Sequence, residues 1–282
     1  MQNLLNRLVI VAGPTAVGKT AYAIRLAREL HTEVVSCDSR QFYREMRIGV
    51  ARPSDDELAA VPHHFIASRP VTNPYNIFDY HHDATDLIRD LIQKYGSAVA
   101  VGGSGLYIDA LIGGVSRLPD PSADLRAELQ QMPLEEKQQL LLELDPDYYH
   151  KVDLQNPVRL QRALEVCITA GRPYSQLLVE QRPTPPPFNY EVRVLSMEPS
   201  ELRNRINRRV DQMVADGLVD EVASLLPYRN LPTLRTVGYR EIFPVIDGTE
   251  SLDTAIAQIK MNTWHYARKQ LTWLRRYDAT VV

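Results

Sequence analysis

Short apolar runs alternate with longer amphipathic stretches in the first hundred residues of the chain. Residues 8–12 are apolar without interruption, and residues 33–36 and 98–101 predict two further short strands. Between these runs, residues 21–30 and 77–95 carry apolar side chains at the three- and four-residue spacing of a helix that buries one face. Strands alternating with such helices predict a parallel sheet covered on both faces, which is an α/β fold.

The alternation stops in the middle of the chain. Residues 115–189 are predicted to be mainly helical, and a proline-rich run near their end, residues 183–187, leads to a strand at residues 191–196. Helices are predicted over residues 122–131, 134–144 and 157–170, and two long ones follow over residues 201–215 and 252–275. We therefore predict an α/β core made of residues 1–114 and 190–282, interrupted by a helical insert of residues 115–189.

Composition and charge narrow the class of protein. The chain has 282 residues, 44% of them apolar and 24% charged, which is ordinary for a globular protein. No apolar run approaches the roughly 20 residues of a membrane helix, and the first strand begins too early for a signal peptide. Cys37 and Cys167 lie far apart, which argues against a disulfide framework. We expect a cytoplasmic protein without membrane contact, and its net charge of −3 argues against indiscriminate nucleic-acid binding.

Directly after the first predicted strand, eight residues match the phosphate-loop pattern G-x-x-x-x-G-K-[ST] without a gap. They are Gly13, Pro14, Thr15, Ala16, Val17, Gly18, Lys19 and Thr20. In such a loop the backbone N–H groups turn inward, and the helix that follows adds the positive end of its dipole. The lysine reaches the outer phosphates and the final hydroxyl, that of Thr20, ligates Mg²⁺. The chain is therefore predicted to bind a diphosphate or triphosphate with magnesium.

Asp38 follows the second predicted strand and is a candidate general base. Ligands of parallel sheets bind at the carboxyl ends of the strands, so this carboxylate would face the phosphates and could accept a proton from a nucleophile. The alternative is a local capping role. The third strand ends in a glycine-rich loop, residues 102–105, and offers no aspartate. This favours group transfer to an acceptor over a hydrolytic motor.

Basic side chains gather in the last third of the chain. Arg205 and Arg209 are four residues apart on a predicted helix, where one or both could hold a diphosphate, unless this is simply a solvated face. The last helix mixes basic and aromatic side chains, which is typical of RNA contact, although Trp264 and Trp273 fit a core equally well.

Two other features give weaker indications. Residues 52–74 are rich in proline, histidine and aspartate, and we expect irregular loops there. The histidine pairs at residues 63–64 and 81–82 lack spaced partners of a metal-ligating type, so loop and capping roles are expected for them.

Five segments together resemble the bacterial tRNA dimethylallyltransferase family, also called tRNA isopentenyltransferases. They are GPTAVGKT, Asp38-Ser39-Arg40-Gln41, GGSGLY at residues 102–107, residues 159–165, and RKQLTW at residues 268–273. A phosphate loop alone is unspecific, but five segments in this order are highly specific, and the resemblance spans essentially the full chain. It implies a P-loop NTPase-like parallel sheet core with a helical inserted domain.

The resemblance also implies a reaction. A dimethylallyl group would pass from dimethylallyl diphosphate to N6 of the adenosine 3′-adjacent to the tRNA anticodon, with release of pyrophosphate. Asp38 would be the general base for the adenine amine. The leaving pyrophosphate would be held by Thr15, Lys19 and Thr20 with Mg²⁺, and by Arg205 or Arg209. The amine is a poor nucleophile, so the charge of the leaving group must be neutralised.

Contacts with tRNA follow from the same resemblance, together with a grip of the insert on the anticodon stem-loop. The matching positions are Asp38, Ser39, Arg40, Gln41, Ser104, Gln161, Arg162, Ala163, Leu164 and Glu165, with Arg126 as a further contact. Ser104 stands where the family usually has threonine, and the hydroxyl is retained. We expect a monomer whose partners are tRNA and dimethylallyl diphosphate.

Three alternatives remain open. An adenylate (cytokinin-type) isopentenyltransferase would prenylate free AMP or ADP, but it would not need the large insert. A P-loop kinase for a small metabolite would be protected against heat by ATP in place of dimethylallyl diphosphate. A non-catalytic RNA-binding module would have no turnover, so an Asp38→Ala substitution would remove none. An enzyme should lose most of its activity in this variant while it keeps its affinity for tRNA.

Overall fold

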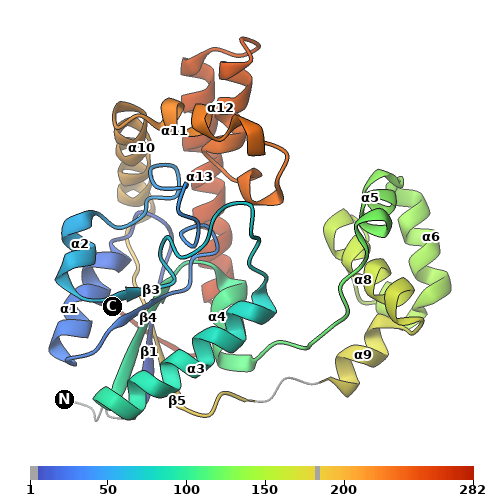
Figure 1. Cartoon of the computed structure of the whole chain (residues 1–282), viewed down its shortest axis with the longest axis horizontal. Helices are drawn as coiled ribbons and strands as arrows, with labels where there is room; N and C mark the ends of the chain where they lie inside the picture. The colour runs from blue at the N-terminus through green and yellow to red at the C-terminus, as the bar shows by residue number, and fades with distance from the viewer. Residues whose placement is uncertain (1–5, 182–184) are drawn as a thin grey trace. The chain divides into compact units, whose positions relative to one another are not determined.

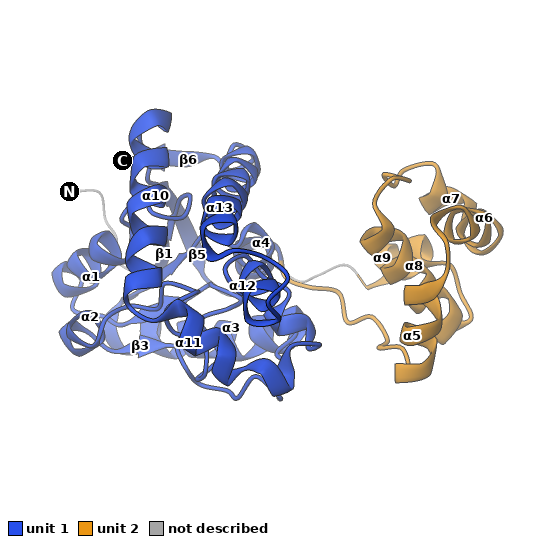
Figure 2. Ribbon diagram, turned by 90° about the horizontal axis from the view of Figure 1, so that it is seen from above, with its two compact units in different colours: residues 1–113, 185–282 blue, residues 114–184 orange. Residues whose placement is uncertain are grey.

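The computed structural model describes residues 6–181 and 185–282. It contains two compact units, the first made of residues 1–113 and 185–282 and the second of residues 114–184 (Figure 2). The chain therefore leaves the first unit once and returns to it once. The predicted proline-rich run at residues 183–187 lies partly outside the described residues.

Within the described residues, the first unit is built on a six-stranded sheet in which all neighbouring strands are parallel. The strands are β1 (Arg7–Ala12), β2 (Val34–Ser36), β3 (His63–His64), β4 (Ser97–Gly102), β5 (Asn189–Val194) and β6 (Ala279–Val281). Their order across the sheet is β3-β2-β4-β1-β5-β6, so β1 lies between β4 and β5. The predicted α/β fold with a parallel sheet is confirmed.

Helices cover the sheet on both sides (Figure 1). Those of the first unit are α1 (Lys19–Glu29), α2 (Asp55–Ala60), α3 (Ile77–Tyr95), α4 (Gly105–Gly113), α10 (Pro199–Ala215), α11 (Leu218–Ser224), α12 (Tyr239–Ile246) and α13 (Leu252–Leu274), with the short 3₁₀ helices η1 (Leu226–Tyr228) and η2 (Pro232–Leu234). The prediction for residues 77–95 is confirmed at both ends, where Asn76 caps the first turn and Gly96 ends the last. No helix in the described part of the chain combines the length and the apolar character needed to cross a membrane.

The burial of the side chains of β1 explains why its sequence is apolar at residues 8–12. Leu8 and Ile10 belong to the apolar cluster that includes residues of α3 and α4. Val9 and Val11 belong to a second cluster that includes residues of α1 and α10. Successive side chains of a strand point to opposite faces, and a parallel sheet with helices on both faces buries them all. All four side chains are fully buried.

Short elements are the part of the fold that the hydrophobic pattern does not predict. The expected loops at residues 52–74 contain α2 and β3. The helices α4, α11 and α12 and the strand β6 are also absent from the prediction. Each of these elements has nine residues or fewer, which is too short for a repeat of the apolar pattern to stand out.

The second unit is helical. It contains α5 (Ala123–Gln131), α6 (Leu134–Leu144), α7 (Pro146–Tyr149), α8 (Pro157–Ala170) and α9 (Tyr174–Glu180). The predictions for residues 134–144 and 157–170 are confirmed, and α5 begins one residue later than predicted because Ser122 is its N-cap. The short helices α7 and α9 are not predicted. The buried core of the second unit consists of Leu129, Leu141, Leu160, Ala163 and Leu164.

A buried carboxylate joins three helices of this unit. Asp145 follows α6, is fully buried, and accepts a hydrogen bond from the N–H group of Tyr148 in α7 at 3.0 Å. The N–H and hydroxyl groups of Ser175 in α9 also donate to this carboxylate, each at 2.7 Å. A buried charge needs such donors because it has lost its hydration. Asp145 therefore holds α7 and α9 to the end of α6.

We expect the substitution Asp145→Ala to lower the free energy of unfolding of the second unit by about 2–4 kcal/mol, because buried donors lose their partner. Hydrogen–deuterium exchange should become faster in α7 and α9 and stay unchanged in β1 and β4. The matched control is Asp147→Ala, which changes an exposed side chain two residues away. Equal exchange in the two variants would contradict this role of Asp145.

Candidate active site

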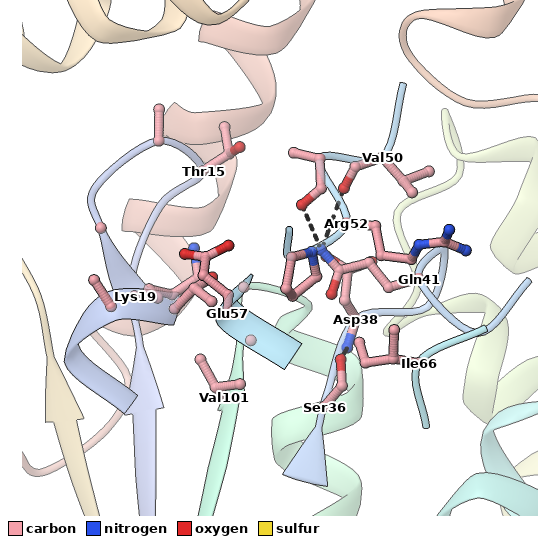
Figure 3. Close-up of a pocket in the computed structure, with 18 of the residues that line it drawn as sticks. Thr15, Lys19, Ser36, Asp38, Gln41, Val50, Arg52, Glu57, Ile66 and Val101 are labelled. Atoms are coloured by element: carbon pink, nitrogen blue, oxygen red, sulfur yellow. Dashed lines mark hydrogen bonds between the residues drawn. The ribbon is translucent and has the colours of Figure 1, made fainter. Parts of the chain in front are cut away.

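The carboxyl ends of β1, β2 and β4 lie at one edge of the sheet, and each strand continues into a loop. These loops enclose a cavity of about 300 Å³, to which α2, α10 and α13 also contribute side chains (Figure 3). Ligands of parallel α/β sheets bind at this edge, because the loops after the strands gather there. Among the side chains that line the cavity are Thr15, Lys19, Thr20, Asp38, Glu57, His63, Arg209 and Gln270. Five of these eight were predicted as site residues from the sequence.

The phosphate-loop segment connects β1 to α1. Gly18 is the N-cap of α1 and has φ of 103°, a left-handed conformation that favours glycine. The side chain of Lys19 folds back over the loop, and its Nζ donates a hydrogen bond to the carbonyl oxygen of Pro14 at 2.7 Å. The first N–H groups of α1 have no partner within the helix, and the helix dipole is positive at this end. The segment therefore has the geometry of an anion-binding loop.

Three charged groups from separate elements influence one another in the cavity. Burial lowers the pKa of Lys19 from 10.5 to about 8, although the Asp38 carboxylate opposes this effect, and the Arg209 guanidinium lowers the pKa further. Burial also lowers the pKa of Arg209. Two poorly hydrated cations beside one carboxylate leave the cavity ready to accept an anion.

Asp38 both holds a local turn and lines the cavity. Its Oδ1 accepts a hydrogen bond from the N–H group of Arg40 at 2.9 Å, which is a local Asx-type turn. The same side chain lines the cavity (Figure 3). These roles are compatible because a carboxylate has two oxygens, and one is enough to hold the turn.

A second cavity, of about 360 Å³, adjoins the first. The two are lined in common by Thr15, Asp38, Val50, Ala51, Arg209 and Tyr266. The second is also lined by Ser39 and Arg40, and by Arg240 of α12. Asp38 and Arg209 therefore lie where the two cavities meet, and the predicted residues Ser39 and Arg40 line the second.

The wall shared by the two cavities is held from both sides. Gln41 donates from Nε2 to the carbonyl oxygens of Val50 at 3.2 Å and Ala51 at 3.0 Å (Figure 3). The Glu221 carboxylate of α11 accepts hydrogen bonds of 2.7–3.0 Å from the N–H groups of residues 47–49. Gln41, predicted as a tRNA contact, therefore has a structural role in shaping this wall.

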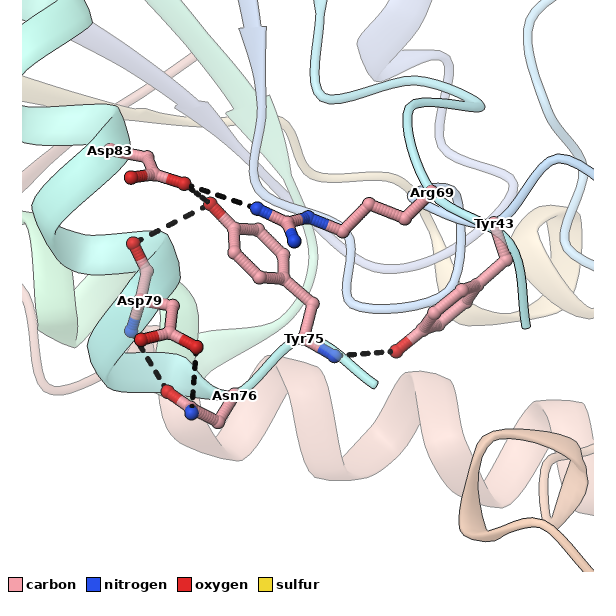
Figure 4. A network of polar contacts seen from close by, with 6 residues as sticks. All are labelled: Tyr43, Arg69, Tyr75, Asn76, Asp79 and Asp83. Carbon is pink, nitrogen blue, oxygen red and sulfur yellow. Dashed lines mark hydrogen bonds and ion pairs between the residues drawn. The ribbon is translucent and has the colours of Figure 1, made fainter. Parts of the chain in front are cut away.

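An aromatic network supports the loop after β2 from behind. The hydroxyl of Tyr43 accepts a hydrogen bond from the N–H group of Tyr75 at 3.2 Å. The hydroxyl of Tyr75 donates to Asp83 of α3 at 2.6 Å, and the guanidinium of Arg69 lies 3.8 Å from the centre of the Tyr75 ring (Figure 4). The loop that carries Asp38 and Gln41 is thereby attached to α3.

Gln270 of α13 connects two of the loops at the edge of the sheet. Its buried side chain accepts a hydrogen bond from the N–H group of Thr15 at 2.8 Å and donates one to the carbonyl oxygen of Gly103 at 2.8 Å. A Cβ atom on Gly103 would lie only 2.2 Å from Nε2 of Gln270, so a larger residue there would displace this carboxamide. Sequence reasoning included Gln270 within the RKQLTW segment but gave it no role, since a mid-helix glutamine has no distinctive signal.

The two candidate arginines of α10 lie in different places. Arg209 is half-buried and lines both cavities. Arg205 is exposed and pairs with Glu201 at 3.4 Å. Its guanidinium lies near the phosphate loop, 4.0 Å from where a Cβ atom on Gly18 would stand. Arg209 is therefore the arginine inside the site, and Arg205 lies at its rim.

The tryptophans of α13 serve mainly in packing. Trp273 lies directly against Gly105 and donates from its indole to the hydroxyl of Tyr277 at 3.2 Å. Trp264 packs on the apolar cluster that contains Val9 and Val11. A surface groove beside Trp273 is lined by His265, Arg268, Lys269, Thr272 and Arg276, which leaves the basic part of this helix exposed.

The insert residues predicted to contact tRNA divide into two groups. Arg126 and Arg162 lie 3.7 and 3.5 Å from the buried carboxylate of Glu165, to which Gln161 donates a hydrogen bond at 3.0 Å. Glu165 is therefore an anchor for two arginines that remain partly exposed. The side chains of Ala163 and Leu164 are fully buried in the core of the insert. The prediction that these two contact tRNA is corrected, because no macromolecule can reach them.

A loop with anion-binding geometry that lines one cavity with a carboxylate, at the carboxyl edge of a parallel sheet, is the arrangement of a P-loop-type protein. The family model described as IPP transferase matches residues 41–277. The chain belongs to the tRNA dimethylallyltransferase family. It is 44% identical over 276 residues to the tRNA dimethylallyltransferase of Christiangramia forsetii, covering 96% of this chain and 91% of that one.

Further relatives and solved structures support this family membership. The chain is 43% identical to tRNA dimethylallyltransferase 1 of Bacteroides thetaiotaomicron, over 95% of this chain and 88% of that one. The crystal structure of the full-length tRNA isopentenylpyrophosphate transferase of Bacillus halodurans has a TM-score of 0.71 and 34% identity, covering 98% of this chain and 89% of that one. A eukaryotic dimethylallyltransferase acting on tRNA shares the fold, with a TM-score of 0.83, 23% identity, and coverage of 98% of this chain and 73% of that one.

We expect Gln270→Leu to weaken the binding of inorganic pyrophosphate about tenfold, because the Thr15 N–H group and the Gly103 carbonyl both lose a buried partner. Isothermal titration calorimetry measures the affinity, and the matched control is Gln258→Leu on the same helix. Unchanged pyrophosphate affinity in Gln270→Leu would show that the two loops keep their positions without this link.

The lowered pKa of Lys19 predicts a dependence of pyrophosphate affinity on pH. An anion binds the charged lysine, so this part of the affinity is complete below pH 8 and should fall up to about tenfold per pH unit above it. The arginine of Lys19→Arg stays protonated, so its affinity should not show this fall above pH 8. Dividing the wild-type affinity by that of Lys19→Arg at each pH cancels the ionisation of pyrophosphate itself. If the affinities of wild type and Lys19→Arg changed with pH in parallel, the pH dependence would not come from Lys19.

Proposed function

We propose that this enzyme transfers the dimethylallyl group of dimethylallyl diphosphate to N6 of the adenosine 3′-adjacent to the anticodon of tRNA. The bond between the allylic carbon and the diphosphate oxygen breaks, and a bond from that carbon to N6 forms. The N6 proton passes to Asp38, and pyrophosphate leaves. The observation that carries the proposal is that Asp38 and Arg209 lie where two cavities meet, one of which contains the phosphate loop.

The first cavity suits the leaving group. Negative charge grows on the diphosphate as the allylic carbon becomes cationic. Lys19, Arg209 and the N–H groups at the start of α1 would stabilise that charge, because they are fixed in a poorly solvated space before the reaction begins. Arg205 at the rim would add a weaker, more hydrated contact.

The same cavity also fits a magnesium ion. The Thr20 hydroxyl and the Glu57 carboxylate both line it, and Mg²⁺ prefers such oxygen ligands together with substrate phosphates. We assign Thr20 as the protein ligand. When bound, Mg²⁺ would neutralise part of the charge of the pyrophosphate.

The second cavity suits the acceptor nucleotide. The exocyclic amine of adenine is a poor nucleophile, and removal of its proton by Asp38 compensates for this as the new bond forms. Arg40 and Arg240 line the second cavity and would bind the backbone phosphates beside the base. A base in a loop is accessible once it leaves its stack, so the anticodon loop is a reachable target.

Contacts outside the cavities would position the rest of the tRNA. We propose that Arg126 and Arg162, oriented by Glu165, place positive charge on the insert for the phosphates of the anticodon stem-loop. Gln161 and Ser104 would add polar contacts. We propose that the enzyme acts as a monomer.

The direct test is incubation with unmodified tRNA and dimethylallyl diphosphate, followed by mass analysis of the nucleosides. Wild-type protein should add one dimethylallyl group to one adenosine. Asp38→Asn should lower the rate by about 100-fold or more through loss of the base, while tRNA affinity changes less than about threefold. Asp90→Asn, which changes an exposed carboxylate of α3, is the control. Full activity of Asp38→Asn would exclude Asp38 as the base.

A further inference from the structure

One histidine of the first cavity has a buried nitrogen without a partner. His63 lies in β3, and its Nδ1 is 2.8 Å from the carbonyl oxygen of Val61. A carbonyl only accepts hydrogen bonds, so Nδ1 carries the hydrogen and Nε2 holds a bare lone pair. Nε2 is buried and has no hydrogen-bond partner among the described residues. The ring is therefore fixed as a hydrogen-bond acceptor.

The position of His63 restricts what can occupy that acceptor. His63 lines the first cavity together with Lys19, Thr20 and Glu57. Among the described residues that line the second cavity, where we place the adenine, His63 does not appear. The residue that carries the unpartnered nitrogen therefore lies on the side of the site where we place the diphosphate.

A diphosphate oxygen alone does not satisfy this nitrogen. Ionised phosphate oxygens only accept hydrogen bonds, so a direct contact would require a protonated imidazole. Burial is the largest influence on His63 and lowers its pKa, and His64 acts in the same direction, whereas the hydrogen bond to the Val61 carbonyl oxygen raises it. The Glu57 carboxylate also raises this pKa, but the two effects together do not outweigh burial. The partner must therefore bring a hydrogen of its own.

A hydrated Mg²⁺ ion supplies such a donor. Mg²⁺ gives up water reluctantly and usually keeps several water molecules in protein sites. Each bound water is a hydrogen-bond donor that needs an acceptor beside it. Resting on the function proposed above, we propose that Nε2 of His63 accepts a hydrogen bond from a water molecule of the Mg²⁺ that accompanies the diphosphate. His63 is thus a positioning residue, which acts on the ion through water.

The test compares pyrophosphate binding with and without Mg²⁺ by calorimetry. His63→Phe keeps the size of the ring and removes the acceptor. We expect this variant to reduce the gain in affinity from Mg²⁺ about 5- to 10-fold, the effect of one water-mediated hydrogen bond, and to leave binding in EDTA within about twofold of wild type. His63→Gln, whose carbonyl oxygen can accept the same hydrogen bond, should recover most of the gain. His64→Gln is the matched control, because His64 bonds to Glu33 at 2.5 Å instead of lining the cavity.

Several outcomes would overturn the inference. Equal losses in Mg²⁺ and in EDTA would mean that His63 contacts the diphosphate or only supports the fold. The inference would also fail if wild-type protein bound pyrophosphate with the same affinity with and without Mg²⁺. If His63→Phe does not fold, ¹⁵N NMR of histidine-labelled wild-type protein decides the matter, with the His63 signal assigned from its loss in His63→Gln. Neutral His63 with Nδ1 protonated in the Mg²⁺–pyrophosphate complex is expected, and a protonated ring would refute the proposal. A wild type that binds no pyrophosphate at all would instead contradict the proposed function.

Discussion

One buried carboxamide sets the distance between the two loops on which this site depends. Gln270 accepts a hydrogen bond from the loop after β1 and donates one to the loop after β4. Backbone groups at the end of a parallel sheet have no neighbouring strand to bind, so their positions must be fixed from outside the sheet. The last long helix supplies that constraint. The phosphate loop is thus held both by its own turn and by a side chain that lies 255 positions further along the sequence than Thr15.

The charged side chains of the site are held in place by other residues that support their loops. Lys19, Asp38 and Arg209 come from three elements and line one cavity, where the other two groups alter the pKa of the buried lysine. Their supports lie one layer further out. The aromatic network behind the loop after β2, and Glu221 behind residues 47–49, hold backbone, while Lys19, Asp38 and Arg209 line the first cavity. The charged groups that we propose to act in the reaction and the groups that support the loops are therefore different residues, with Asp38 as a partial exception.

Sequence reasoning reached those parts of the structure that have a local signal. Residues 8–20 combine an apolar run with a spaced motif, and α3 has a capping asparagine, a long amphipathic repeat and a terminal glycine, so both were predicted correctly. Gln270 and His63 have no such signal, because their roles arise only when distant segments meet. Ala163 and Leu164 show the opposite error: family resemblance placed them on a contact surface, while the helical spacing of α8 buries them. The short elements α2, α4, α11 and α12 were missed because few residues carry a weak periodicity.

The position of the insert has a consequence for how the protein is made. Strand β1 pairs with β4 on one side and β5 on the other, and β5 lies beyond the entire second unit in the sequence. A ribosome therefore releases β1 with one of its hydrogen-bonding edges unmatched, and that edge stays so until all of residues 114–184 have been synthesised. Arg209 and Gln270 emerge later still. The nascent chain contains the complete phosphate-loop motif long before it contains the residues that turn this motif into a site.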